Sequence, residues 1–181
     1  MKANSKTLAG KRIAILLTDG FEESEMTEPY KALVKAGAKP FIITPKGSKV
    51  RSWLHNRWSK YFKVNYNLGK VKASQFDGIV LPGGVMNPDK LRVDKSAIRF
   101  IKHFLDANKP VAAICHGPWT LIETGKVKGL KLTSYHSIKS DLINAGAKWT
   151  NKKVVVDGKL VTSRSPDDLP AFNREMLKSY L

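Results

Sequence analysis

Four short apolar runs, each ended by a polar or turn-forming residue, set the strongest limit on how this chain folds. The runs are Arg12–Thr18, Lys39–Thr44, Gly78–Leu81 and Val111–Ile114. Runs of this length without polar alternation are typical of strands covered on both faces. Because helical segments alternate with them, the sequence predicts an α/β fold with a mostly parallel sheet and helices on both faces.

The other elements are recognised by their spacing and by residues that start or stop them. Glu25–Ala36 has apolar residues at helical spacing, and Gly37 is a common stop signal. Asp94 is suited to cap a helix over Lys95–Ala107. We further expect a strand at Lys131–Ser134, helices ending near Gly125 and spanning Ile138–Ala145 and Asp168–Tyr180, a hairpin of Val154–Val156 with Lys159–Thr162, and a loop or small hairpin over Pro45–Lys70.

Length and composition indicate one ordinary globular domain. With 181 residues, of which 42% are hydrophobic, the chain can bury a sizeable core. We divide it into a polar tail at 1–10 and one domain at 11–181. The tail lacks the apolar core of a signal peptide, and no apolar stretch is long enough to span a membrane. We therefore expect a cytoplasmic protein without membrane contact.

One cysteine and four histidines limit the metal chemistry that the sequence predicts. A single cysteine allows no intrachain disulfide and no cysteine-based metal site. His55, His103 and His136 have no metal-ligand spacing with carboxylates or with the cysteine. Gly83-Gly84 lacks the rest of a phosphate-binding glycine motif. We expect neither a metal nor an organic cofactor.

The cysteine, Cys115, lies where an apolar strand turns abruptly into a helix. Val111–Ile114 precedes it, and Gly117-Pro118 follows, with proline favoured in a first helical turn. A thiol over the positive end of a helix has a pKa between about 3.5 and 7.5 instead of about 8.5, and is a good nucleophile. The alternative is an inert core cysteine, because free cysteine is among the most buried residue types. The elbow favours the nucleophile.

Five motifs in register resemble the ThiJ/PfpI family of the class I glutamine-amidotransferase-like superfamily. They are Asp19–Glu25, Leu81–Gly84, Ala113–Pro118, Asn144–Ala147 and Thr162–Pro170, and the likeness extends over Lys11–Leu181. The chain is most similar to bacterial PfpI-like stress proteins, which are described as proteases, glyoxalases or deglycases. The resemblance implies a flavodoxin-like three-layer sandwich with a nucleophile elbow, assembled as homodimers or as hexamers built from dimers.

The resemblance also implies the central pair of the site. Cys115 matches the family nucleophile, and Glu25 matches the glutamate whose carboxyl contacts that sulfur. A carboxyl beside a thiolate is expected to be partly protonated, because neighbouring negative charges raise one pKa, and it can then transfer a proton. The alternative is a surface carboxylate at a helix N-terminus. We favour that alternative for Glu22 and Glu23, although Glu22 matches a position near the pocket of relatives.

The remaining polar groups of the site have competing interpretations. Gly83 and Gly84, with the amide after Cys115, form either an oxyanion hole or a plain turn. Side chains of neighbouring residues at a sharp turn commonly diverge, which argues against a simple pair of Cys115 with His116. In peptidases of the family this histidine nonetheless pairs with the cysteine and with an acid of the neighbouring subunit. Asp89 matches that acid, which then orients His116 in an oligomer.

Three larger side chains are candidates for the walls of the site. Tyr135 aligns with a pocket-lining tyrosine of the family, and a core aromatic is an equal alternative. Arg164 either binds an anionic group or, more commonly, ties down a loop. Trp119 stands where many relatives have glutamine, so we expect a larger and more apolar wall near the elbow.

Charge is the unusual feature of the composition, with 32 Lys and Arg against 15 Asp and Glu, a formal +17. Eleven of the basic residues and no acidic residue lie between Lys31 and Gln75. The aromatic residues of this stretch include Trp53, Trp58, Tyr61, Phe62 and Tyr66. Such a pattern can track phosphates and stack on bases, so nucleic acid is a candidate partner. We favour the simpler interpretation, a solvated cationic face whose aromatics pack inward or into a subunit interface.

Three functional hypotheses follow. The first is a cofactor-independent cysteine enzyme for stress protection that hydrates methylglyoxal or early glycation adducts, as a glyoxalase or deglycase does. Cys115 attacks the carbonyl, Glu25 moves the proton, and water releases a hydroxy acid. The second is an intracellular cysteine peptidase or amidase using Cys115, His116 and Asp89. The third is a redox sensor or chaperone-like stress protein whose Cys115 is oxidised to a sulfinic acid.

Overall fold

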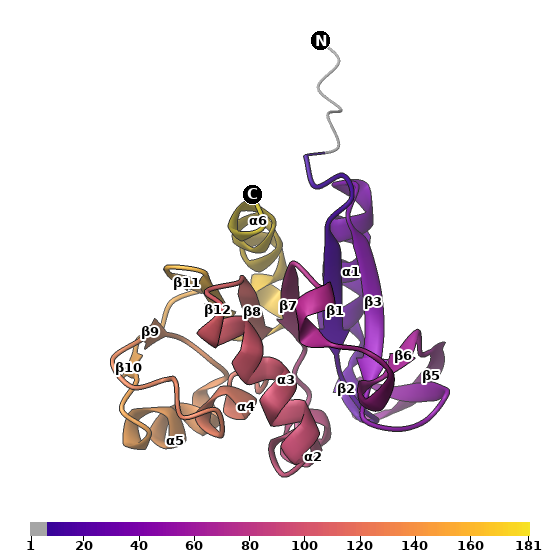
Figure 1. Ribbon diagram of the computed structural model, residues 1–181. Coiled ribbons are helices and arrows are strands. Elements are labelled where there is room, and N and C mark those ends of the chain that lie inside the picture. The colour runs from indigo at the N-terminus through magenta and orange to yellow at the C-terminus, as the bar shows by residue number, and fades with distance from the viewer. Residues whose placement is uncertain (1–6) are drawn as a thin grey trace.

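A seven-stranded sheet forms the centre of the computed structural model, which describes residues 7–181 (Figure 1). The strands are, in spatial order, β11 (Val154–Asp157), β12 (Leu160–Ser163), β8 (Val111–Ile114), β7 (Gly78–Leu81), β1 (Arg12–Leu16), β3 (Lys39–Thr44) and β6 (Tyr66–Asn67). All neighbouring strands pair in parallel except β11 and β12, which form an antiparallel hairpin. The predicted mostly parallel sheet is confirmed.

Helices cover both faces of the sheet, which makes three layers (Figure 1). On one face, α1 (Glu23–Lys35) packs beside α6 (Leu169–Ser179). The other face carries α2 (Met86–Arg92), α3 (Lys95–Asp106), α4 (Trp119–Ile122) and α5 (Lys139–Asn144). Side chains of one strand alternate between the two cores: Ile13 and Ile15 join the first, Ala14 and Leu16 the second. The three-layer α/β architecture expected from the resemblance is confirmed.

Two small sheets complete the fold. One joins β2 (Phe21–Glu22), β4 (Lys49–Leu54) and β5 (Arg57–Lys63), and the other pairs β9 (Lys131–Leu132) with β10 (Lys148–Trp149). The hairpin of β4 and β5 realises one of the two options for Pro45–Lys70. Its turn residues His55 and Asn56 both have positive φ, which suits the twist of a two-residue hairpin. Short 3₁₀ turns lie at Leu68–Lys70, Ala73–Gln75, His136–Ile138 and Pro166–Asp168.

Most element boundaries agree with the sequence, and the differences have local causes. Asp94 caps α3 as expected, accepting hydrogen bonds from the amides of Ser96 and Ala97 at 2.8 and 2.9 Å. The helix α2 was not expected, because Pro88 lies inside it and the segment is too short to show a period. Of the expected polar tail, residues 1–6 lie outside the described part of the chain. Leu8 is buried at 1% exposure.

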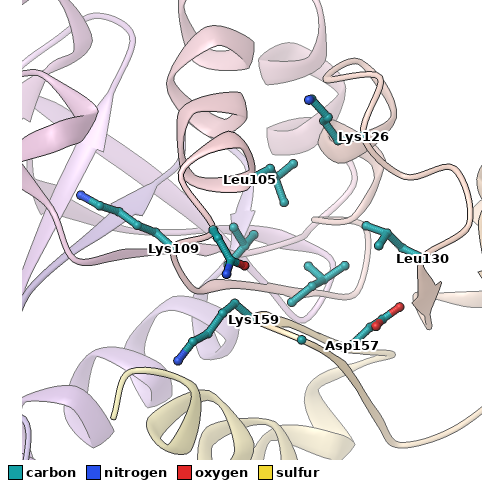
Figure 2. A pocket seen from close by; sticks show the side chains of 10 residues that line it. Leu105, Lys109, Lys126, Leu130, Asp157 and Lys159 are labelled. Atoms are coloured by element: carbon teal, nitrogen blue, oxygen red, sulfur yellow. The ribbon is translucent and has the colours of Figure 1, made fainter.

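A cavity of about 290 Å³ lies at the amino ends of β8 and β12 (Figure 2). Three lysines contribute to its lining, but their ammonium groups point away from one another (Figure 2). Lys109 donates to the carbonyl of Phe76 at 2.6 Å, Lys126 pairs with Asp106 at 2.6 Å, and Lys159 donates to the carbonyl of Ser179 at 3.1 Å. The ammonium groups of the three lysines that line this cavity therefore do not converge on it. Within residues 7–181, no helix has both the length and the apolar character needed to cross a membrane.

Candidate active site

Cys115 lies at the carboxyl end of β8 with φ of 62°, in the left-handed region that a cysteine rarely adopts. Its N–H donates to the carbonyl of Ser163 at 3.1 Å, and its own carbonyl accepts from Tyr135 at 2.9 Å. The next turn is closed by a hydrogen bond from Gly117 to Ile114 at 2.8 Å. A Cβ on Gly117 would overlap the carbonyl of Leu81. The predicted strand-to-helix elbow is therefore present, and the surrounding backbone holds its strained residue in place.

Glu25, in the first turn of α1, is completely buried, at 0% exposure. Its Oε2 accepts the N–H of Gly83 at 2.7 Å, whereas Oε1 has no hydrogen-bond partner at regular geometry within residues 7–181. Burial raises the pKa of Glu25 from 4.5 to about 8, and hydrogen bonding with Cys115 and Gly83 only partly opposes this. Glu25 is therefore protonated at neutral pH, as expected, with the sulfur as the side-chain group it can donate to.

The expectation of a depressed pKa for Cys115 is wrong. Burial raises the pKa of the thiol, and the Glu25 carboxylate raises it further by repulsion. The helix that follows, α4, is only four residues long, so its dipole offers little compensation. The two groups are coupled, because they can carry only one negative charge between them. A thiolate on Cys115 requires a neutral Glu25.

Two backbone amides favour the charged form of the sulfur. The N–H groups of Gly84 and His116 hydrogen-bond to Cys115 and lower its pKa, against the larger effect of burial. The N–H of Gly83 belongs instead to Glu25. Gly84 has φ of 72°, and a Cβ there would overlap the carbonyl of Gly20. The oxyanion interpretation thus has donors at Gly84 and His116, while Gly83 positions the carboxyl.

Asn87, which the sequence analysis did not single out, holds this glycine turn. Its buried side-chain amide donates to the carbonyls of Pro82 at 2.9 Å and Gly83 at 3.1 Å. Its Oδ1 accepts the N–H of Thr18 at 2.8 Å, which ties the turn to the end of β1. Asn87 lies on α2, whose presence the sequence pattern did not reveal.

His116 does not diverge from Cys115, contrary to the expectation for adjacent residues. Its Nδ1 lies 3.2 Å from the Sγ of Cys115, and its Nε2 lies 3.0 Å from the Oγ of Ser137. The left-handed backbone at Cys115 departs from extended geometry, in which successive side chains point to opposite faces. Burial lowers the pKa of His116 to about 4, and His136 adds to this effect, so the ring is neutral at pH 7.

Asp89 lies on the surface of α2 and is absent from the lining of the cavity beside Cys115. Within one chain, the Nε2 of His116 faces Ser137. Sequence reasoning missed Ser137, because an exposed serine in a polar turn has no distinctive pattern. The role of Asp89 in a neighbouring subunit stays a proposal.

A cavity of about 510 Å³ opens above the sulfur. It is lined by Gly20, Glu22, Glu25, Trp53, Asn56, Gly84, Val85, Met86, Cys115, His116, Tyr135 and Pro166. Tyr135 lines it as the resemblance implied and stacks on the ring of His116, with centroids 4.7 Å apart. Trp53 and Asn56 come from the hairpin of β4 and β5, which the sequence did not connect with the site.

The interpretation of Glu22 and Glu23 as surface carboxylates is wrong. Glu22 lines the cavity, and partial burial raises its pKa. Glu23 is only 8% exposed and accepts a hydrogen bond from the hydroxyl of Ser52 at 2.8 Å. Both carboxylates face inward because β4 packs against the start of α1.

Trp119 and Arg164 do not line the cavity. The rings of Trp119 and His116 have centroids 6.3 Å apart, and the Arg92 guanidinium lies 4.5 Å from the centroid of the Trp119 ring. The expected apolar wall at Trp119 is therefore wrong, because this ring packs against the hydrophobic core and is absent from the lining of the cavity. Arg164 ties down its loop: it donates to Asp168 at 2.8 Å and to Asn151 at 2.8 Å.

No set of three or more His, Cys, Asp or Glu side chains in residues 7–181 is arranged to hold a metal ion. The polar groups at the cavity include one thiol, two carboxyls, one imidazole and the amides of Gly84 and His116. These groups can add a sulfur to a carbonyl, stabilise the oxygen that becomes negative, and move protons.

Residues 11–179 match the model of the DJ-1/PfpI family. The "Putative cysteine protease YraA" of Bacillus subtilis is 46% identical over 167 residues, which cover 92% of this chain and 96% of that protein. The "Protein/nucleic acid deglycase 2" of Escherichia coli is 43% identical over 169 residues, covering 93% and 96%.

Part of a solved two-domain protein from Anabaena variabilis, which has DJ-1/ThiJ/PfpI-like and ferritin-like domains, has the same fold as this chain. It superposes with a TM-score of 0.87 at 35% identity. The match covers 93% of this chain and 47% of that protein. The likeness extends over nearly the whole of this chain, including the elbow and the glycine turn. The chain belongs to the DJ-1/PfpI family.

Proposed function

We propose that this protein is a cofactor-independent cysteine enzyme that converts reactive carbonyl compounds, such as methylglyoxal or early glycation adducts, into hydroxy acids. One observation carries the proposal: the Glu25 carboxyl lies fully buried beside the Cys115 sulfur in a cavity of about 510 Å³, where burial raises its pKa to about 8. A neutral carboxyl at that position can donate a proton to a carbonyl oxygen and afterwards act as a base. Such a pair suits the rearrangement of a small aldehyde.

In the first step, the Sγ–C bond forms as the thiol proton passes to the Nδ1 of His116, 3.2 Å away. The electron pair of the carbonyl moves onto its oxygen, which receives the proton of Glu25. The product is a hemithioacetal, with Glu25 left as a carboxylate. The N–H groups of Gly84 and His116 stabilise the oxygen or the sulfur while either is negative, an effect worth about 3 kcal/mol per donor.

In the second step, the Glu25 carboxylate removes the hydrogen from the carbon bonded to sulfur. It returns that proton to the neighbouring carbon, and the hydroxyl proton moves between the two oxygens, which gives a thioester of a hydroxy acid. Water then attacks the thioester and loses a proton to Glu25. The Cys115 sulfur leaves as the C–S bond breaks, and it takes up the proton that His116 received in the first step. Methylglyoxal and water thus become lactic acid, and both residues regain their starting protons.

The replacement Cys115→Ala tests this function directly. We expect it to abolish lactate formation from methylglyoxal while the thermal unfolding midpoint stays within a few degrees, because the side chain is small. Cys115→Ser is the matched control, since it keeps a hydroxyl of similar shape and is expected to be almost as inactive. An unchanged rate in Cys115→Ala would rule the mechanism out.

The distance of 3.2 Å between Cys115 and His116 favours a second candidate function, peptide or amide hydrolysis. An amine leaving group needs a proton donor, so this reaction depends on His116 more than aldehyde chemistry does. Asp89 of a neighbouring subunit would support His116 in this version. We expect His116→Ala to lower methylglyoxal turnover about tenfold and to eliminate cleavage of a fluorogenic peptide. Equal loss of both activities would contradict our order of the two functions.

A further inference from the structure

Ser137 provides the polar contact on the far side of the His116 ring. Its Oγ lies 3.0 Å from Nε2, while Nδ1 on the opposite edge lies 3.2 Å from the sulfur of Cys115. The three side chains form a continuous chain of hydrogen-bonding atoms within a single subunit.

The backbone holds Ser137 at this distance. The hydroxyl belongs to the 3₁₀ turn His136–Ile138, which begins after Tyr135. The N–H of Tyr135 donates to the carbonyl of Cys115 at 2.9 Å, so the turn is attached to the elbow itself. The N–H of Thr133 donates to the Oγ1 of Thr162 at 2.9 Å, which anchors the same segment to β12. Stacking on Tyr135 limits rotation of the His116 ring.

A neutral imidazole carries one proton, and the hydrogen bond at one nitrogen decides the role of the other. If Nε2–H donates to the serine oxygen, Nδ1 presents a lone pair to the thiol. In that state His116 can accept the thiol proton during attack on the substrate. If the ring proton were on Nδ1 instead, Nδ1 would have no lone pair with which to accept the proton of the thiol.

We propose that Ser137 is a positioning residue that accepts the Nε2–H of His116 and thereby directs the Nδ1 lone pair at the Cys115 sulfur, so that this relay is complete within one chain. A serine hydroxyl is neutral, so it orients the ring without stabilising the positively charged form. An aspartate at the same place would stabilise that charged form. A ring that takes up and releases a proton in each turnover fits carbonyl chemistry.

The other groups that face His116 leave Nε2 to Ser137. His136 disfavours a positive charge on the ring, and Tyr135 contacts its face. The Trp119 ring centroid lies 6.3 Å from that of His116, and the Arg92 guanidinium lies against the indole at 4.5 Å. Glu25 reaches His116 only through the sulfur. The expected effect of Ser137 on turnover rests on the proposed function. The position of the proton on His116 does not depend on that function.

Nitrogen-15 NMR of histidine-labelled protein at pH 7 tests the proton position independently of activity, with His116 assigned by comparison with His116→Ala. We expect Nε2 to be protonated and Nδ1 to be unprotonated. In Ser137→Ala, solvent exchange of the Nε2 proton should accelerate at least about tenfold. Ser140→Ala, an exposed serine on the next helix, is the matched control and should change nothing. A proton on Nδ1 in the wild type would overturn the proposal.

The same NMR measurement on Asp89→Asn separates Ser137 from an acid of a neighbouring subunit. The proposal predicts wild-type exchange in Asp89→Asn. It is overturned if this variant accelerates the exchange while Ser137→Ala does not. In Ser137→Asp, a carboxylate replaces the hydroxyl, and we expect the pKa of His116 to rise by about one unit or more.

Kinetics with methylglyoxal test the consequence for turnover. Ser137→Ala should lower kcat about three- to tenfold with KM unchanged, and Ser137→Thr, which keeps the hydroxyl, should recover most of the loss. An unchanged kcat in Ser137→Ala contradicts the positioning role. If the wild type itself forms no lactate, the proposed function fails, and the NMR experiment still decides the position of the proton.

Discussion

The cavity at Cys115 and the hairpin of β4 and β5 differ in how far their ionisable side chains are exposed to water. At the cavity, Glu25 is withdrawn from water, and its pKa rises to about 8. On the hairpin, cations lie beside aromatic rings near the surface: the ammonium of the exposed Lys49 lies 4.5 Å from the Tyr61 centroid, and the guanidinium of the half-buried Arg51 lies 5.5 Å from that of Trp58. Removal of Glu25 from water creates a group that can transfer protons near neutral pH. The many basic side chains that stay in contact with water do not form such a group.

The aromatic residues between Lys31 and Gln75, which form one group in the sequence, lie in different regions of the structure. Phe62 packs on Phe21 in the core, with centroids 5.7 Å apart. Trp53 lines the cavity and contacts Trp58 at 5.5 Å, so the two regions meet at this pair. Trp58 and Tyr61 are 40% and 57% exposed. Nucleic-acid binding there stays a proposal, which requires an affinity that falls steeply with salt.

Glu25→Gln gives the largest expected difference between the two regions. It keeps the shape of the side chain but removes the transferable proton, so we expect kcat for methylglyoxal to fall about 10²- to 10⁴-fold. Stopped-flow or coupled lactate assays measure this. Lys60→Gln, on the hairpin, is the control and should stay within twofold. A fall of less than tenfold in Glu25→Gln would contradict the role of Glu25 as proton carrier.

The buried carboxyl should also make stability depend on pH. Because the pKa of Glu25 is raised on folding, its contribution is most favourable below pH 4.5 and is lost as the pH rises towards about 8. Between pH 4.5 and about 8, this contribution amounts to a loss on the order of 4 kcal/mol in the free energy of unfolding. Urea unfolding at pH 5, 6.5 and 8 measures it.

Glu25→Gln supplies the reference for that measurement. Its free energy of unfolding should change less between pH 5 and 8 than that of the wild type, because the glutamine does not ionise. Parallel curves for the two proteins would show that other groups cause the pH dependence.

Trp53→Ala tests the place where the two regions meet. Removing a wall of the cavity should raise KM for methylglyoxal about tenfold with a smaller effect on kcat, because the ring is remote from proton transfer. Trp58→Ala is the matched control, since its ring contacts Trp53 but does not line the cavity. Equal effects of the two replacements would mean that the hairpin acts as a unit.

Lys49→Gln is expected to have the smallest effect. The residue is exposed, and the cation–aromatic contact with Tyr61 contributes about 0.5 kcal/mol. We expect a change in the free energy of unfolding within about 0.5 kcal/mol and an unchanged kcat. A loss above about 2 kcal/mol in urea unfolding would show that the hairpin charges support the fold.

The order of the main strands and of the helices other than α2, the elbow at Cys115 and the hairpin at Asp157-Gly158 were predictable from the sequence, because they depend on local signals. Apolar runs define the strands, and Asp94 caps its helix by contacts two and three residues away. The family motifs also identified Glu25 and Tyr135 as residues of the site. In these cases the information lies within a few residues or in a motif of known spacing.

Only the tertiary structure decided where the protons reside and which side chains meet. The pKa values of Glu25 and Cys115 depend on burial by segments far apart in the chain, so the expected acidic thiol was wrong. The contacts of His116 with Ser137, and of Trp53 with the cavity, arise from turns and packing that leave no periodic trace. The physical reason is that desolvation and side-chain contact belong to the assembled surroundings of a residue, whereas the sequence records only its neighbours along the chain.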